Sequence, residues 1–186
     1  GFPLLLPNGT IIFNEMVAFM REKLRKRQYQ EIRTPHIMNA DLWKRSGHWD
    51  HYRQNMYVTQ IEEKDFAVKP MNCPGAALAF SQGLRSYREL PLRLAEFGLC
   101  HRYEASGTLH GTIRVRGFVH DDAHLFCTLD QVQAEITDLI ALLREVYSAY
   151  GMDEVLMFLS TRPADRTGSD EMWDRAEASL ADALRA

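Results

Sequence analysis

The sequence has no run of apolar residues near the ~20 that a membrane-spanning helix needs, and no stretch rich in glycine, serine or proline that would mark a linker. Its 3 cysteines, Cys73, Cys100 and Cys127, form no CxxC pair, which argues against a disulfide framework and indicates a reducing compartment. The net charge of −3 excludes a dedicated nucleic-acid coat. What remains is one soluble globular domain over residues 1–186.

The two ends of the sequence bear on what the chain represents. The apolar start, GFPLLLP, is too short for a signal peptide and lacks its basic flank. The last residues, SLADALRA, break off inside an amphipathic pattern. We therefore expect the chain to be a piece of a longer protein.

Apolar residues at helical spacing predict a first helix that is capped by Thr10 and ends before an extended segment at 29–35. The basic residues between Arg21 and Arg27 fit a solvated helix end, with a nucleic-acid contact as the alternative. Residues 56–59 and 65–69 predict two strands that form a hairpin across 60–64. Pro74 predicts the start of a helix that runs to Gln82 and stops at Gly83.

The second half of the chain predicts two more helices and one strand. Residues 128–131 form a capping box that opens a helix ending near Gly151, and residues 155–159 are expected to form a buried strand. Asp170 and Glu171 open a last helix, whose inward residues are expected to be Trp173, Ala176, Leu180 and Leu184. Because strands and helices mix without βαβ regularity, the fold class is α+β, with an antiparallel sheet flanked by helices.

Polar residues gather on one face of two extended runs around a predicted loop at 105–111. Arg102 and Glu104 share a face on the first run, and alternate positions on the second bring together Arg114, Arg116, Phe118, His120, Asp122 and His124. The reverse face, from Ile113 to Ala123, is expected to be packed. Mixed charges alone would favour an exposed surface of ion pairs. Phe118 among them favours a nucleotide-phosphate site instead, since guanidinium groups bind phosphate and an aromatic ring stacks on a base.

A second cluster surrounds Cys73, which precedes the predicted helix at Pro74. The start of a helix stabilises a thiolate. Taken singly, Cys73 is most simply a buried core thiol and His124 a structural histidine. Together they could provide two ligands of a zinc site with sulfur and nitrogen donors.

An ordered set of sequence words carries a family resemblance over essentially all 186 residues. The chain resembles the catalytic domain of the threonyl-tRNA synthetase family, within the class II aminoacyl-tRNA synthetases. The words are SGHWDHY (46–52), KPMNCPG (69–75), SYRELPLRLAEFG (86–98), HRYE (101–104), RVRGF (114–118), DDAHLFC (121–127), LSTRP (159–163) and GSDEMWDRAE (168–177).

The resemblance implies a class II synthetase-type antiparallel sheet flanked by helices, which stops before the final strand and helix of motif 3. The helix from Thr10 and the strand ending at Pro35 resemble motif 1, which implies a homodimer. The strands around Arg102 and Arg114 resemble motif 2.

For ATP and its Mg²⁺, the resemblance implies a catalytic role for Arg102, which would hold the α-phosphate as the threonine carboxylate attacks it. Glu104 would orient the adenine, Phe118 would stack on it, and Arg114 would lie at the phosphates.

For the amino acid, the resemblance implies that Cys73 and His124 bind Zn²⁺, with a third protein ligand beyond residue 186. Asp122 would meet the substrate ammonium, and Met71 would line the pocket. The zinc would read the amino and hydroxyl groups, which rejects valine, whereas serine would pass and need a separate editing site. His120 replaces the family's usual glutamine, and our hypothesis is that it alters substrate contacts without abolishing activation.

The implied function is activation of L-threonine with ATP, followed by transfer to tRNA(Thr), in the cytoplasm or alternatively in the mitochondrion, with no membrane partner. One alternative is a synthetase-like paralogue that binds amino acid or adenylate without charging tRNA. Another is a zinc-stabilised structural module, which would unfold when the metal is removed.

Overall fold

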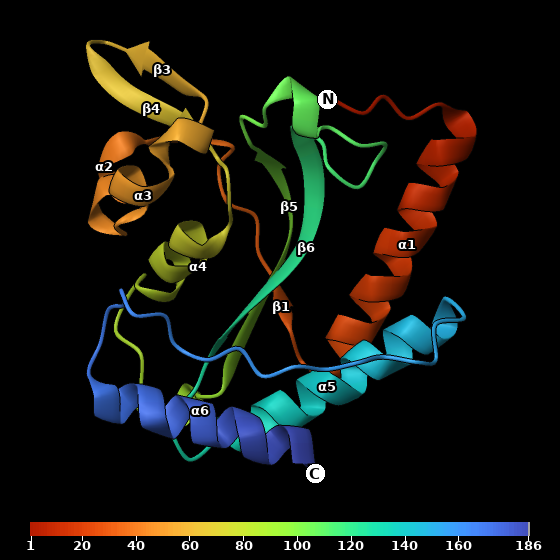
Figure 1. Cartoon of the computed structure of the whole chain (residues 1–186), viewed down its shortest axis with the longest axis vertical. Helices are drawn as coiled ribbons and strands as arrows, with labels where there is room; N and C mark the ends of the chain where they lie inside the picture. The colour runs from red at the N-terminus through yellow and green to blue at the C-terminus, as the bar shows by residue number, and fades with distance from the viewer. Residues whose placement is uncertain (186) are drawn as a thin grey trace. The chain divides into compact units, whose positions relative to one another are not determined.

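The computed structural model describes residues 1–185, which divide into two compact units (Figure 1). The first unit contains residues 1–85 and 93–124, and the second contains residues 86–92 and the chain from Leu125 onward. Within residues 1–185, no helix has the length and the apolar content needed to cross a bilayer. Each unit is described separately below.

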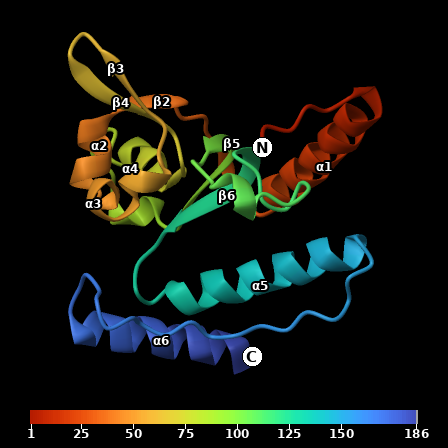
Figure 2. The same ribbon diagram turned by 45° about the horizontal axis from the view of Figure 1, so that its top comes forward.

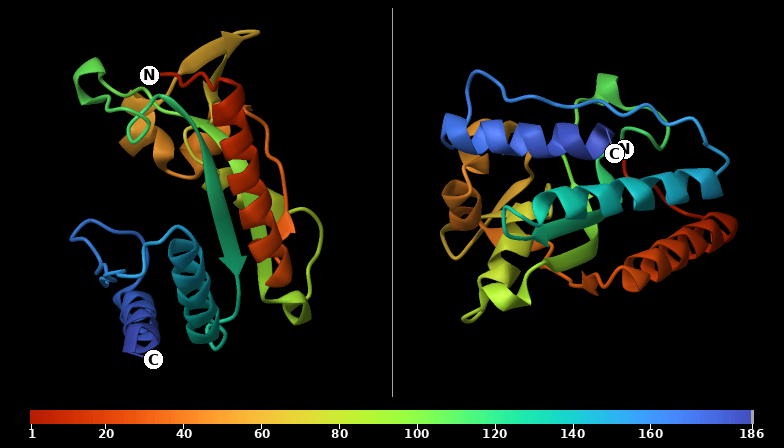
Figure 3. Two further views of the ribbon diagram at one scale, coloured as in Figure 1. Left: turned by 90° about the vertical axis from the view of Figure 1, so that its right-hand side faces the viewer. Right: turned by 90° about the horizontal axis from the view of Figure 1, so that it is seen from below.

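The first unit begins with helix α1 (Pro7–Lys26). The prediction that Thr10 caps this helix was wrong, because Leu6 is the N-cap and Pro7 takes the first position, where a missing N–H costs nothing. Leu24 is buried, and the Arg21 guanidinium lies 5.1 Å above the ring of Phe97 in β5. The helix therefore runs beside a sheet, as Figures 2 and 3 show.

That sheet has the strand order β1-β5-β6, with β1 (Gln30–Glu31), β5 (Leu92–His101) and β6 (Gly117–Phe126). Most of β5 and β6 belongs to the first unit. β1 pairs with β5 in parallel, in the register Gln30↔Leu94. The connection between β5 and β6 is longer than the predicted loop at 105–111 and contains a short 3-10 helix, η3 (Ser106–Thr108).

A second sheet has the order β2-β4-β3 and is antiparallel throughout, as predicted. Its strands are β2 (Ile37–Asn39), β3 (Val58–Ile61) and β4 (Lys64–Val68). The predicted hairpin is confirmed with a tighter turn, since only Glu62 and Glu63, both at positive φ, lie between the strands. A core of Met38, Trp43, Met56 and Ala67 packs on this sheet.

Short helices complete the first unit: α2 (Ala40–Arg45), α3 (His48–Tyr52), η1 (Arg53–Asn55) and α4 (Cys73–Phe80). The prediction of a helix around Pro74 is confirmed for α4, which ends two residues before the expected Gln82. Gly83 follows at φ 80°, a conformation that favours glycine.

The second unit contains η2 (Tyr87–Glu89), α5 (Val132–Ala149) and α6 (Asp170–Arg185). Helices α5 and α6 lie side by side (Figure 2). Only half of the predicted capping box forms: the side chain of Gln131 accepts from the Thr128 N–H at 3.0 Å, and Gln131 itself is the N-cap of α5. On α6, Trp173 and Leu180 are half-buried as predicted, whereas Ala176 and Leu184 are exposed.

The predicted buried strand at 155–159 was wrong. This segment is not part of any sheet of residues 1–185, and Leu156 and Phe158 are each 84% exposed. The exposure alternates along the segment, as it does in a strand, but a strand needs a neighbour to satisfy its backbone groups. The described residues supply no such neighbour.

Candidate functional site

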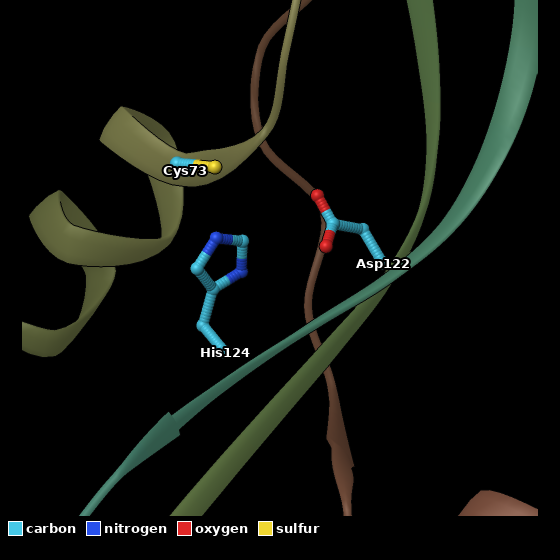
Figure 4. Close-up of side chains that lie close together, drawn as sticks. All are labelled: Cys73, Asp122 and His124. Carbon is cyan, nitrogen blue, oxygen red and sulfur yellow. The ribbon is translucent and has the colours of Figure 1, made fainter. Parts of the chain in front are cut away.

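Three side chains with metal-binding chemistry converge between α4 and β6. Cys73 is the first residue of α4, and Asp122 and His124 occupy alternate positions of β6, so they share one face. One ligand atom from each residue lies within 4.8 Å of the other two. Figure 4 shows the imidazole of His124 between the thiol and the carboxylate. The structure thus brings together two predicted ligands and a predicted substrate-binding carboxylate.

This donor set fits a divalent cation of the zinc type, because a thiolate, an imidazole and a carboxylate are its usual ligands. Cys73 is exposed rather than a buried core thiol. Partial desolvation raises the pKa of the Cys73 thiol, and the nearby charge of Asp122 raises it further. The backbone at the helix start lowers the pKa of Cys73, as expected, but desolvation raises it more.

Behind this cluster lies a polar residue that the sequence analysis missed. Asn72 is completely buried, and its Nδ2 donates a hydrogen bond to Asp122 Oδ2 at 3.2 Å. On its other side, the thiol of Cys100 donates to Asn72 Oδ1 at 3.5 Å. The signal available in the sequence was an asparagine next to the candidate ligand Cys73. Its partners, Cys100 and Asp122, are distant in the sequence and could not be predicted from local patterns.

A buried ion pair supports the same segment and was also missed. Lys69 Nζ lies 2.8 Å from Glu96 Oε1 and donates to Thr34 Oγ1 at 2.9 Å, with Lys69 0% and Glu96 5% exposed. The backbone N–H and hydroxyl of Thr34 both donate to Glu96 Oε1 at 2.9 Å. The Lys69 carbonyl accepts from His101 N–H at 2.9 Å. The segment before α4 is therefore held to β5 by a side-chain ion pair at Glu96 and by a backbone hydrogen bond at His101.

Arg102 and Phe118 meet beside the sheet, although Arg102 and Glu104 follow the end of β5 and are not strand residues as expected. The guanidinium carbon of Arg102 lies 5.1 Å from the centroid of the Phe118 ring, and Arg102 Nε donates to the carbonyl of Pro70 at 3.1 Å. Within residues 1–185, the terminal nitrogens of Arg102 make no hydrogen bond or ion pair. This arrangement holds the guanidinium in place and leaves its outer donors available for an anion.

Arg114 and Arg116 are not strand residues, because β6 begins at Gly117. Arg114 still faces Glu104, with both Nε and Nη2 3.0 Å from Oε2. Arg116 turns into the connection, where Nε donates to the Glu104 carbonyl at 2.9 Å and Nη2 to Ser106 Oγ at 3.1 Å. The expectation that Arg116 joins the polar face was wrong, since it braces the connection instead.

Of the other predicted site residues, His120 lies beside the cluster, whereas Met71 contacts the nearby core. His120 Nδ1 is 3.8 Å from Asp122 Oδ2, and the His120 ring is 6.2 Å from that of Phe118. Met71 is half-buried and packs against the core around Trp43. The regular alternation from Phe118 to His124 is thus confirmed.

The packed reverse face predicted for this strand is only partly present. Val115 and Gly117 are buried, but Val119 is 40% exposed and Ile113 86% exposed. Ile113 lies in the connection rather than in β6, so strand alternation does not apply to it.

The sequence of the chain is similar to a known family and to known proteins. The family described as tRNA synthetase class II core domain (G, H, P, S and T) matches residues 57–179. Threonine–tRNA ligase of Thiobacillus denitrificans is 56% identical over 178 residues, which are 96% of this chain and 28% of that protein. The chain therefore spans less than a third of the length of this relative.

Two solved structures share the fold. One is described as the RNA binding domain of threonyl-tRNA synthetase from Cryptosporidium parvum, with a TM-score of 0.91 and 43% identity, covering 98% of this chain and 45% of that one. The other is a putative threonyl-tRNA synthetase from Aeropyrum pernix, with a TM-score of 0.72 and 33% identity, covering 88% of this chain and 38% of that one.

Proposed function

Because the chain belongs to the family of class II tRNA synthetase core domains, we propose that it forms the part of a threonine–tRNA ligase catalytic domain that carries motifs 1 and 2. The proposed enzyme activates L-threonine with ATP to threonyl-adenylate and pyrophosphate, and then transfers threonine to the 3′ end of tRNA(Thr). The observation that carries this proposal is the cluster that Cys73 of α4 forms with Asp122 and His124, which lie on the β6 face that also presents Phe118.

At the amino-acid end, Cys73 and His124 would hold Zn²⁺, which when bound supplies a Lewis-acid site for the amino and hydroxyl groups of threonine. The carboxylate of Asp122 accepts hydrogen bonds from the N–H groups of the substrate amino group. Met71 would line the amino-acid pocket. A substrate without a hydroxyl leaves a position unfilled, and such loss discriminates more strongly than one methyl group in an apolar pocket, which is worth about 10–200-fold.

At the ATP end, Arg102 donates to the α-phosphate and stabilises the charge that develops as the threonine carboxylate attacks. Phe118 offers a ring face for the adenine, and Glu104 orients the base. Arg114 would exchange its contact with Glu104 for the phosphates, which carry Mg²⁺ as their counterion. The side chain of Arg114 is 56% exposed, so breaking its ion pair with Glu104 costs little free energy.

The partners follow from the same assignment. We propose a homodimer formed through α1 and β1, where apolar side chains such as Ile11 and Ile12 are about 60% exposed. We also propose a reducing, cytoplasmic location, because the 3 cysteines of the sequence form no CxxC pair.

Amino-acid-dependent ATP–pyrophosphate exchange by the full-length protein tests the proposal. We expect exchange with threonine, weaker exchange with serine and almost none with valine. A folded, zinc-loaded protein that shows no exchange with any amino acid would contradict it. The chain would then belong to a paralogue that binds amino acid or adenylate without activating it.

A further inference from the structure

The side chain of Asn72 is hydrogen-bonded on both sides, although the proposed function assigns it no contact with a substrate. It directly precedes α4, has no exposed surface, and links Cys100 in β5 to Asp122 in β6 through its two amide atoms. A buried amide that is satisfied at both ends has a defined orientation. Asn72 is therefore a rigid connector between the two strands.

The direction of the amide follows from its neighbour in β5. Burial raises the pKa of the Cys100 thiol to about 11, so that the thiol keeps its proton and donates it to Asn72. Asn72 Oδ1 is therefore the acceptor, which turns the Nδ2 donor toward Asp122. The carboxylate, which can only accept when ionised, receives this donor on Oδ2.

Gly98 in β5 supplies the floor on which the amide rests. A Cβ atom at this position would lie 2.6 Å from both Cγ and Nδ2 of Asn72, closer than non-bonded atoms approach. The obstacle is the buried amide itself rather than the end of a flexible side chain. A side chain at position 98 therefore cannot be accommodated unless the amide of Asn72 shifts.

One oxygen of the Asp122 carboxylate is thus held by the connector, and its remaining accepting capacity faces the cluster. His120 Nδ1, at 3.8 Å from Oδ2, is a competing partner toward which a released carboxylate could turn. We infer that Asn72 is a positioning residue for amino-acid recognition: its amide aims Asp122 at the amino group of the substrate, and Gly98 keeps the amide in place. The inference rests on the proposed function, because the amino group is that of the proposed substrate.

Two substitutions at Asn72 in the full-length protein test the inference. Asn72→Asp keeps the shape but replaces the donor by a second carboxylate, and Asn72→Ala removes the side chain. Since a hydrogen bond to a charged group stabilises its partner strongly, we expect the threonine KM in pyrophosphate exchange to rise by about tenfold to a hundredfold. The ATP KM should stay within about twofold of wild type, which a general loss of packing would not produce.

Gly98→Ala provides an independent test, because the added methyl group should displace the Asn72 side chain while residue 72 remains asparagine. We expect the same selective rise in threonine KM. In the double variant Asn72→Ala/Gly98→Ala, the effects should not add, since the obstacle is gone. Gly107→Ala is the matched control, because a Cβ there meets nothing within 4 Å. If the two effects add, Gly98→Ala disturbs β5 independently of Asn72, and the role of Gly98 in holding the Asn72 amide is overturned.

Crystal structures of wild type and Asn72→Ala separate this inference from the proposed function. We expect the Asp122 carboxylate to turn away from its wild-type orientation in the variant. If threonine-dependent exchange occurs but the threonine KM of the folded variants stays within about threefold of wild type, the inference is overturned and the proposed function stands. If wild type shows no exchange, the proposed function fails. Separately, an Asp122 carboxylate that keeps its wild-type orientation in the Asn72→Ala crystal structure would overturn the positioning role of Asn72.

Discussion

Two glutamates on the same stretch of chain, Glu96 in β5 and Glu104 just after it, form ion pairs of opposite character. Glu96 and its partner Lys69 are buried and hold the segment before α4 in place. Arg114, the partner of Glu104, is 56% exposed. The first pair can only be structural, whereas the second can open for a ligand. This difference separates the scaffold of the site from the groups that meet the substrates.

The cost of breaking each pair should reflect this difference. A buried charge that loses its partner keeps its full desolvation penalty, whereas exposed charges return to water. The predictions below test this contrast, beginning with the largest expected effect.

Lys69→Met should lower the free energy of unfolding by about 3–5 kcal/mol, because Glu96 would remain buried without its cation. Chemical denaturation of the full-length protein measures this loss. The double variant Lys69→Met/Glu96→Gln should recover part of it, since both charges are then removed. A loss below about 1 kcal/mol for the single variant would contradict the structural role of the pair.

Arg102→Gln should leave the free energy of unfolding nearly unchanged but lower kcat for pyrophosphate exchange. The expected loss is about 100-fold to 1,000-fold, the usual effect of removing one donor that stabilises transition-state charge. Exchange at saturating ATP and threonine measures it. If the rate stays within about fivefold of wild type, Arg102 does not act on the α-phosphate.

Arg114→Ala should change the free energy of unfolding by less than about 1 kcal/mol, because exposed ion pairs contribute little. The ATP KM should rise severalfold while the threonine KM does not change. Steady-state exchange kinetics with each substrate varied in turn will show this. An effect confined to the threonine KM would move Arg114 away from the ATP site.

Arg21→Gln breaks the exposed ion pair between α1 and β1 and should have the smallest effect. Its hydrogen bond to Glu31 lowers the pKa of that carboxyl, so the pair stabilises the fold above the ordinary carboxyl pKa and loses this effect as the pH falls through the lowered value. We expect a difference below about 1 kcal/mol at about pH 7 that decreases as the pH falls below the ordinary carboxyl pKa and is lost once Glu31 is protonated in the folded protein. Urea denaturation at a series of pH values measures it, and a difference that does not decrease in acid would contradict the assignment.

Local patterns in the sequence were enough to predict α4, the β3–β4 hairpin and the shared face from Phe118 to His124. Each of these depends on residue spacing within one or two elements. The same reasoning failed at Arg116, because the length of the connection between β5 and β6 decides where strand alternation begins. It also failed at residues 155–159, where a strand needs a neighbour that periodicity cannot supply.

The scaffold of the site was invisible for a related reason. Lys69, Glu96 and Thr34 are far apart in the sequence, and their contacts arise only when β5 packs against the segment before α4. Asn72 is in a sequence word that carries the family resemblance, but its link to Asp122 needs the fold. The groups that meet substrates were found from their chemistry, whereas the groups that position them required the structure.

Cys73, Asp122 and His124 are proposed to form a metal-dependent centre that recognises threonine. This proposal can be tested by calorimetry of threonine and of valine with the full-length protein, before and after zinc removal by a chelator. We expect threonine to bind only the zinc-loaded protein and valine to bind neither form, with circular dichroism unchanged by the chelator. Equal threonine binding after zinc removal would contradict the claim, and unfolding on zinc removal would show that the metal is structural.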